Sequence, residues 1–360
     1  MAHRHHLRRS LGALALAVST LAAAPAAQAV TFQFRDIGTT PMSALQLSAF
    51  QSAGNYWSSK LTDSVTVYVN IAFADLPTNV LGSTGSNFTT ANYSTLRSAL
   101  ISDATSAADA TAVANLQTGP ALSFLATQGD LSSRLDNDGS TNNTLLGLTT
   151  ANAKAVGLPV NTNAANPDGT IQFANAFANT FAYARDANGQ VPAGLTDFIT
   201  VAEHEIGHAL GFISGVDDID FCAGPANACG LLNTVGRFET DWWYEPLDLF
   251  RFSAAGQMDV RVGGSPYFSI NGGATSITSF STGATHGDGW QASHFGPNEV
   301  NLMRAFVGRG QSYDATARDL TAFDVMGWNL VTAVPEAGTW VLMLVGLVGM
   351  GGAVQRRRAD

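Results

Sequence analysis

The stretch His204-Glu-Ile-Gly-His-Ala-Leu-Gly-Phe212 places two histidines four positions apart, with a glutamate beside the first. On a helix this spacing puts both imidazoles on one face, about 6 Å apart along the axis, so both can reach one metal ion. Glu205 is then placed to take a proton from water at that ion. Gly211, three residues after His208, is typical of the extended motif, in which the chain turns sharply towards a third ligand.

Few other histidines compete for this role. The chain has seven, and those at positions 3, 5 and 6 precede the expected start of the mature protein. Besides the motif pair only His286 and His294 remain, both in one short segment. Imidazole nitrogen is a preferred zinc ligand, so the sequence predicts Zn²⁺ at His204 and His208. The alternative is a set of scattered surface or satisfied core histidines.

A catalytic zinc usually takes three protein ligands and leaves the fourth position to water. The compact form of the motif would place a third histidine at position 214, where this chain has Ser214. Histidines elsewhere are the better chemical candidates, and nearby or downstream carboxylates are the alternatives. The candidates are His294, His286 as the reserve ligand, Asp217, Asp218, Asp220, Glu239 and Glu245.

A resemblance narrows this choice. The motif, a long insertion, Ser293-His294-Phe295, Asn301-Leu302-Met303 and the segment 321–328 together resemble leishmanolysin-type metzincins, in which an inserted subdomain delays the third histidine. The resemblance implies that His204, His208 and His294 bind zinc, that Glu205 is the catalytic base, and that Met303 forms the methionine turn beneath the metal. A core methionine is the plainer alternative for Met303.

The resemblance covers the motif helix and residues 290–330. The order of a strand, a helix and then an irregular half that carries the ligand indicates an α+β fold. The resemblance implies a metzincin-like catalytic domain with a mixed twisted sheet, an active-site helix, an inserted subdomain and a C-terminal helix. It also implies a secreted zinc endopeptidase acting on protein or peptide substrates. Two other classes stay open, a surface or biofilm-matrix protein with structural zinc and a zinc hydrolase with a non-peptide substrate.

Sequence patterns predict the elements that position the site. A helix is expected to begin at Pro41, a strand with one buried face to cover 65–73, a helix to cover 96–116 and a short strand 170–173. The short strand is a candidate edge for pairing with an extended substrate. The apolar residues of the first helix include Leu45, Leu47, Phe50 and Trp57.

The motif helix is predicted to have Asp197 as its N-cap and to end near Gly215, with Glu203 on its solvent side. The long segment 216–290 is interpreted as an insertion with strands of its own. Its cluster Trp242-Trp243-Tyr244 is predicted to fill a core or line a cleft. A last helix is expected over 316–326, opened by a capping box of Thr316 and Asp319.

A polar stretch covers residues 129–143. Gly139 does not stand where an EF-hand calcium loop requires its glycine, so a solvated loop is expected rather than a calcium site.

Both ends of the chain resemble targeting segments. Residues 1–29 have the basic, apolar and small-residue order of a secretory signal peptide. The tail 335–360 begins within Val334-Pro335-Glu336. It continues with an apolar run over 337–354 that is long enough to cross a bilayer, and with arginines at 356–358. This tail resembles the PEP-CTERM sorting signal of Gram-negative bacteria. It implies transient membrane anchoring, processing by an exosortase as well as signal peptidase, and delivery to the cell surface or exterior. A plain membrane anchor is the alternative.

The remaining residues 30–334 are expected to form the protease domain, with an N-terminal lobe 30–215 and an inserted and C-terminal part 216–334. They contain 12 basic and 26 acidic side chains, a formal charge of −14. So acidic a surface does not bind nucleic acid by counterion release. The only cysteines, Cys222 and Cys229, lie close together just after the motif helix, and in an exported chain they predict a local disulfide.

Overall fold

The structure is a computed structural model, which describes residues 29–225, 229 and 238–331. One of its lobes is built on a four-stranded sheet with the strand order β1-β2-β8-β3. β1, β2 and β8 run parallel and β3 runs antiparallel to β8, so the sheet is mixed. The strands are β1 (Thr31–Asp36), β2 (Thr66–Ala74), β3 (Gly82–Ser86) and β8 (Gly169–Ala174).

The long strand β2 shows how the sequence pattern becomes a sheet face. Val67, Val69 and Ile71 are buried, while the residues between them are partly exposed. Successive side chains of a strand point to opposite faces, so this alternation buries one face only. The strand predicted over 65–73 and its buried face are confirmed, as is the strand predicted over 170–173.

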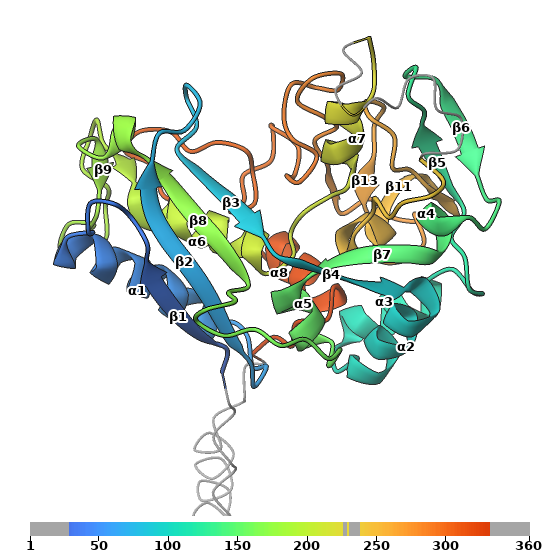
Figure 1. The fold of residues 1–360 in the computed structure, drawn as a ribbon, viewed down its shortest axis with the longest axis horizontal. Coiled ribbons are helices and arrows are strands. Elements are labelled where there is room, and N and C mark those ends of the chain that lie inside the picture. The colour runs from blue at the N-terminus through green and yellow to red at the C-terminus, as the bar shows by residue number, and fades with distance from the viewer. Residues whose placement is uncertain (1–28, 226–228, 230–237, 332–360) are drawn as a thin grey trace, which may run out of the picture.

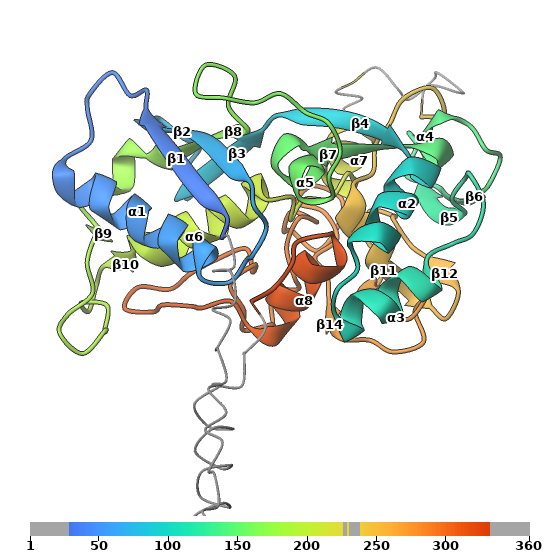
Figure 2. The same ribbon diagram turned by 90° about the horizontal axis from the view of Figure 1, so that it is seen from below.

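Two helices, α1 (Ala44–Ser58) and α6 (Phe198–Ala209), cover the buried face of this sheet (Figures 1 and 2). Phe50 of α1, Phe173 of β8 and Phe198 of α6 meet with ring centroids 4.3 to 5.2 Å apart. Such ring contacts add about 0.5–1.5 kcal/mol each beyond the burial of apolar area. This aromatic core fixes α6, the motif helix, against the sheet.

Helix α1 begins three residues after the predicted Pro41. Ser43 is its N-cap and forms a capping box with Gln46, which satisfies the backbone amides of these two residues. Of the predicted apolar positions Phe50 and Trp57 are buried, whereas the side chains of Leu45 and Leu47 are exposed.

The second lobe contains residues from both halves of the chain (Figure 1). The amide of Val260 donates to the carbonyl oxygen of Leu125 and that of Gly147 to Tyr244. Residues 88–155 therefore lie with the 216–290 segment, and the lobes are not the consecutive parts 30–215 and 216–334. The elements are β4 (Phe88–Asn92) paired with β7 (Leu145–Thr149), β5 (Phe124–Thr127) paired with β6 (Ser133–Asp136), α4 (Thr141–Thr144) and α5 (Thr150–Ala155).

The single helix predicted over 96–116 is wrong, because the structure has two helices there, α2 (Tyr93–Asp103) and α3 (Ala107–Asn115). The backbone leaves the helical region at Ala104. Ser106 then begins a new helix through a capping box with Asp109. The alanine-rich composition indicated helix correctly, but a local cap divides it.

The segment 216–290 has strands of its own, as predicted. Four of them form an antiparallel sheet in the order β12-β11-β13-β14, preceded by the helix α7 and the 3₁₀ helix η2. The predicted disulfide between Cys222 and Cys229 is present. The bounds are α7 (Val216–Cys222), η2 (Pro246–Phe250), β11 (Arg251–Ala254), β12 (Gln257–Met258), β13 (Tyr267–Phe268) and β14 (Thr278–Ser279).

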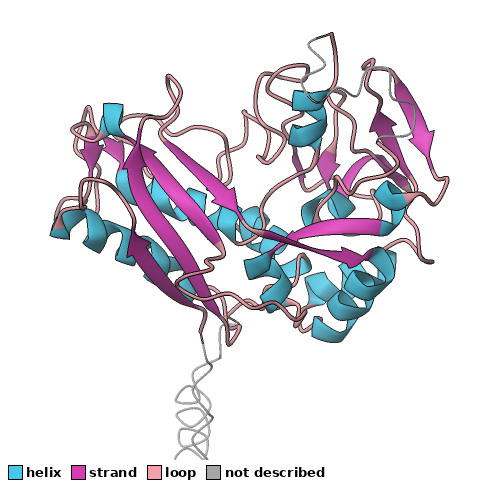
Figure 3. Ribbon diagram, viewed as in Figure 1, coloured by secondary structure: helices cyan, strands magenta, loops and turns pink. Residues whose placement is uncertain are grey.

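The last helix, α8 (Ala317–Val325), lies between the two lobes in Figure 1. The predicted capping box of Thr316 and Asp319 is confirmed. Short elements complete the first lobe, namely η1 (Asn175–Phe177), β9 (Phe181–Ala182) and β10 (Thr196–Asp197). Helices and strands occur in both lobes (Figure 3), which confirms the α+β class.

Within the described ranges, no helix has the length and apolar character needed to cross a bilayer. The signal peptide predicted over 1–29 and the sorting tail predicted over 335–360 fall outside the described residues, apart from residue 29.

Candidate metal site

The motif helix α6 is anchored at its start by Asp197, the predicted N-cap. Its carboxylate accepts hydrogen bonds from the amide and hydroxyl of Thr200 and pairs with Arg185. The helix ends at Ala209, earlier than the predicted Gly215, because Gly211 adopts a φ of +113°. Residues with a side chain rarely adopt that backbone conformation, so glycine permits the sharp turn that the motif predicts.

The structure brings together the three predicted histidines. The Nε2 atom of His208 lies 3.0 Å from that of His204 and 3.3 Å from that of His294. The Nε2 atoms of His204 and His294 are 3.2 Å apart. His208 and His294 are buried, and His204 is partly buried. Two of these residues come from α6 and the third from the irregular chain after β14, so the site forms only when the lobes are assembled.

The other ring nitrogen of each histidine faces a backbone carbonyl. His204 Nδ1 lies 2.8 Å from the oxygen of Leu302, and His294 Nδ1 lies 3.1 Å from that of Gln291. His208 Nδ1 lies 2.6 Å from the oxygen of Phe212. A carbonyl oxygen only accepts, so each Nδ1 must carry the proton and each Nε2 must present a lone pair.

Three lone pairs that point at one another are repulsive unless a cation lies between them. Burial lowers the pKa of His204 to about 4 and of His208 to about 3, and it lowers that of His294 as well, so protons do not supply the charge at neutral pH. Ligand nitrogens about 2.0–2.1 Å from a tetrahedral zinc lie about 3.3 Å from each other. The observed separations of 3.0–3.3 Å fit that geometry.

Glu205 lies beneath the strand β3. The hydroxyl of Thr84 is 2.7 Å from its Oε2 atom, and the backbone of Gly82 passes so close that a Cβ there would come within 2.8 Å of Oε1. The side chain of Glu205 is almost fully buried. Burial raises its pKa to about 7, while the Thr84 hydrogen bond acts in the opposite direction. A carboxylate with such a pKa is suited to take and return protons near neutral pH.

Met303 lies under the motif helix, fully buried, with its sulfur against Gly207. A Cβ on Gly207 would stand 2.6 Å from that sulfur. The turn that contains Met303 is tied to the site, because its carbonyl oxygen accepts from the amide of Phe295 and its own amide donates to Asp319. The methionine therefore packs against the residue of the motif helix that directly precedes His208.

The alternative ligands lie elsewhere. Asp217 binds backbone amides of residues 292 and 293, Asp220 those of 285 and 286, and Glu239 pairs with Arg134. Glu245 shares hydrogen bonds with Asp248 at the start of η2, and the ring of His286 packs against Gly224. Among the described residues, none of these groups joins the histidine cluster, and the same holds for Asp218.

A second group of potential ligands consists of Asp136 and Asp138, from the stretch predicted to be a solvated loop, and Glu239 from the 216–290 segment. The stretch is more ordered than predicted, because β6 and α4 occupy part of it. Arg134 forms ion pairs with both Asp136 and Glu239. Its guanidinium supplies the positive charge in this cluster, so we assign no ion to it.

The predicted solvent-side position of Glu203 is wrong. Its side chain is 3% exposed, and its Oε2 atom has no hydrogen-bond partner within the described part of the chain. The helix is covered here by α1, whose Trp57 donates to the carbonyl oxygen of Glu203. Burial raises the pKa of the Glu203 carboxyl to about 8.

A pH-dependent stability follows from Glu203. Between pH 4.5 and about 8 the unfolded chain has lost this proton and the folded chain keeps it, so the free energy of unfolding falls as pH rises. We expect Glu203→Gln to remove this slope. The free energy of unfolding of the variant minus that of the wild type should be larger at pH 8 to 9 than at pH 4.5, by roughly 2–4 kcal/mol. Denaturant unfolding at several pH values measures this, and parallel curves for the two proteins would contradict it.

The aromatic cluster of residues 242–244 packs in the second lobe. The Tyr244 ring meets Phe124 with centroids 4.9 Å apart, Trp242 covers Gly147, and Trp243 contacts Phe238. Tyr244 is buried, and the two tryptophans are partly buried. These contacts agree with the core alternative.

The strand predicted as a substrate-binding edge is not at an edge. β8 is paired on both sides, with β2 and with β3. β3 forms one edge of this sheet and β1 forms the other. Residues Gly82 and Thr84 of β3 contact Glu205. Sequence reasoning missed β3, because the run Gly-Ser-Thr-Gly-Ser has no apolar alternation that would indicate a strand.

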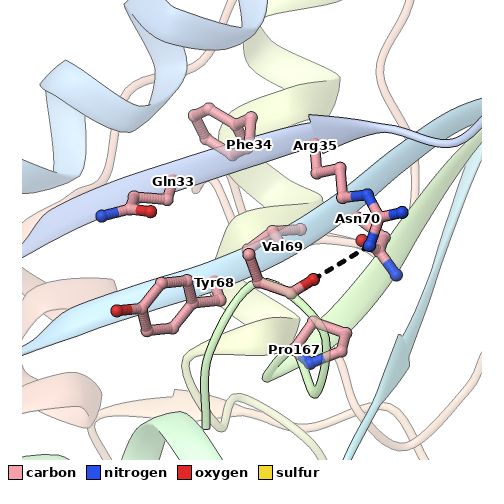
Figure 4. Close-up of a pocket in the computed structure, with 8 residues that line it drawn as sticks. Gln33, Phe34, Arg35, Tyr68, Val69, Asn70 and Pro167 are labelled. Atoms are coloured by element: carbon pink, nitrogen blue, oxygen red, sulfur yellow. Dashed lines mark hydrogen bonds between the residues drawn. The ribbon is translucent and has the colours of Figure 1, made fainter.

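A small hollow lies on the face of the sheet opposite α1 (Figure 4). Across it Arg35 donates to the carbonyl oxygen of Ala164, 3.1 Å away. Its volume of about 60 Å³ has room for a few water molecules. No predicted site residue lines it. The lining residues are Gln33, Phe34, Arg35, Tyr68, Val69, Asn70, Ala164 and Pro167.

In comparisons with known proteins, the chain matches no protein-family model, no curated protein and no solved structure. The likeness to leishmanolysin-type metzincins therefore rests on the motif residues and their spacing.

Proposed function

We propose that the chain is an exported zinc-dependent endopeptidase of the metzincin type, with His204, His208 and His294 as the zinc ligands. The observation that supports this most strongly is the convergence of three imidazoles, two of them buried and one partly buried, whose Nε2 lone pairs face one another. The Nδ1 contacts with backbone carbonyls are those that metal-binding histidines typically make.

Glu205 is the proposed general base. When bound, a zinc ion supplies a Lewis acid that polarises the scissile carbonyl and makes water more acidic. Glu205 accepts a proton from the attacking water, whose oxygen forms a bond to the carbonyl carbon. The same carboxylic acid gives that proton to the nitrogen as the carbon–nitrogen bond breaks. Thr84 holds the carboxylate through its hydroxyl, which leaves the other oxygen for the proton.

The edge strand β3 is the proposed docking place for the substrate backbone. An extended peptide can add to a free sheet edge through main-chain hydrogen bonds. Since Gly82 and Thr84 touch Glu205, a peptide along this edge would pass close to the base. Holding the scissile bond in place contributes to catalysis by orientation.

The chemistry of the donor set favours catalysis over a structural role. Structural zinc sites close with four protein ligands, often cysteines. Within the described ranges the group contains three histidines only, and Cys222 and Cys229 are joined to each other. An open fourth position is what a hydrolase needs.

The cellular context is proposed from the ends of the chain. The signal peptide and the PEP-CTERM-like tail favour export to the surface or exterior of a Gram-negative bacterium, with signal peptidase and an exosortase as processing partners. The disulfide agrees with an oxidising compartment.

Removal of the Thr84 hydroxyl tests the role of Glu205 through pH. The hydroxyl stabilises the charged carboxylate, so Thr84→Val raises the pKa of Glu205. Because the base must be deprotonated, the acidic limb of kcat/KM is expected to move to higher pH by roughly one unit. Rates measured from pH 5 to 9 check this, and a shift to lower pH or none would contradict the assignment.

The proposed function is tested with the exported protein in three states, which are zinc-loaded, stripped by a chelator and reloaded. Casein and synthetic peptides should be cleaved by the first and third states only. Cleavage that survives full removal of the metal would contradict the proposal. A zinc-loaded protein that hydrolyses only non-peptide bonds would show that the chain is a zinc hydrolase with a non-peptide substrate. A zinc-loaded protein without any hydrolytic activity would favour a structural zinc.

A further inference from the structure

His294 is far from the motif in sequence, but in the structure its segment lies against the chain that follows the motif helix. The amide of Ser214 donates to the hydroxyl oxygen of Ser293, 2.9 Å away, directly before His294. Position 214 is where the compact motif would place its third ligand. The insertion thus brings His294 back to the point at which the shorter motif would supply a histidine.

Asp217, in the first turn of α7, binds the irregular segment that leads to His294. Its carboxylate accepts the amide of Ala292 at 2.6 Å, and the amide and hydroxyl of Ser293 at 2.9 and 2.5 Å. All three donors lie one or two residues before the ligand. One side chain therefore fixes the position of two successive peptide groups.

Arg251, at the start of β11, holds the same segment from the other side. It is fully buried and donates to the carbonyl oxygens of Ala292 and Ser281, at 3.0 and 2.9 Å. The amide of Ser281 in turn donates to the carbonyl oxygen of His294. Residue Ala292 is thus bound through its backbone amide by Asp217 and through its carbonyl oxygen by Arg251.

We propose that Asp217 is a positioning residue for the metal site: it sets the metal affinity by fixing Ala292 and Ser293, and with them the ring of His294. The inference rests on the proposed zinc site. Interactions beyond the ligands typically change metal affinity by about 10- to 100-fold. The role belongs to this chain's delayed ligand, which cannot rely on the motif helix for its place.

The chain supplies a matched control on the same helix. Asp220 also accepts two backbone amides, those of Thr285 and His286, but these lie in the turn that precedes the ligand segment. Asp217→Asn and Asp220→Asn are therefore the same chemical change in the same helix. Only the first removes an acceptor for the residues next to His294.

The experiment measures zinc affinity by competition with a chelator, the visible spectrum of the Co²⁺-loaded protein, and the unfolding temperature without metal. For Asp217→Asn we expect zinc binding weakened by about 10- to 100-fold and an altered Co²⁺ spectrum. For Asp220→Asn we expect an affinity within about threefold of the wild type. A folded Asp217→Asn variant with wild-type affinity and spectrum would overturn the inference.

A second variant decides the matter if Asp217→Asn does not fold. Ser293→Ala removes the hydroxyl that links Asp217 and Ser214 and leaves the backbone bonds in place. It is expected to bind zinc several times more weakly than the wild type, and equal affinity would overturn the inference. Wild-type protein that binds no zinc would contradict the proposed function itself, so the two failures are distinguishable.

Discussion

Replacement of Glu205 by glutamine is expected to lower peptide hydrolysis by about 10²- to 10⁴-fold while zinc stays bound. Glutamine keeps the shape of the side chain, and its amide oxygen can still accept the Thr84 hydroxyl. It cannot take a proton from water. Single-turnover peptide cleavage and the zinc content of the same sample measure the two effects together.

The neighbouring Glu203 supplies a control for this experiment. It is a buried glutamate on the same helix and has no part in the proposed chemistry. Glu203→Gln should keep most of the activity at neutral pH. A zinc-loaded, folded Glu205→Gln variant that cleaves peptides at the wild-type rate would refute the base assignment.

Removal of the third ligand should release the metal. His294→Ala takes away one of three converging nitrogens, and we expect zinc affinity to fall by more than about 100-fold, beyond the effect of losing an outer contact. Peptide hydrolysis at limiting zinc should be lost in parallel. Zinc content after dialysis against a chelator checks this expectation.

His286→Ala is the matched comparison, since His286 lies eight residues earlier and packs against Gly224 rather than against the cluster. It should retain wild-type zinc affinity. If His294→Ala retained the metal and His286→Ala lost it, the third ligand would have to be reassigned.

Structural features that depend on neighbouring residues in the sequence were predictable. Asp197 and the pair Thr316 and Asp319 begin helices where their side chains can cap them, and the alternation in 65–73 defines a half-buried strand. The motif histidines lie on one helix face for the same local reason. The family resemblance and the small number of histidines indicate His294 as the third ligand, whereas no local pattern around it does.

Features that depend on distant contacts were not predictable. The position of β8 within the sheet depends on β3, whose glycine-rich sequence has no strand pattern. Glu203 is buried because α1 packs over the motif helix, which the helix's own sequence does not reveal. The sequence offers Asp217 as a candidate ligand, but its hydrogen-bond partners lie 75 and 76 residues later in the chain.

X-ray absorption at the zinc edge of the purified protein, combined with its zinc stoichiometry, tests the proposed metal site most directly. Our expectation is one zinc per chain, bound by three imidazole nitrogens at about 2.0–2.1 Å and one exchangeable oxygen. A protein that binds no zinc, or a zinc with sulfur or a fourth protein ligand, would contradict it.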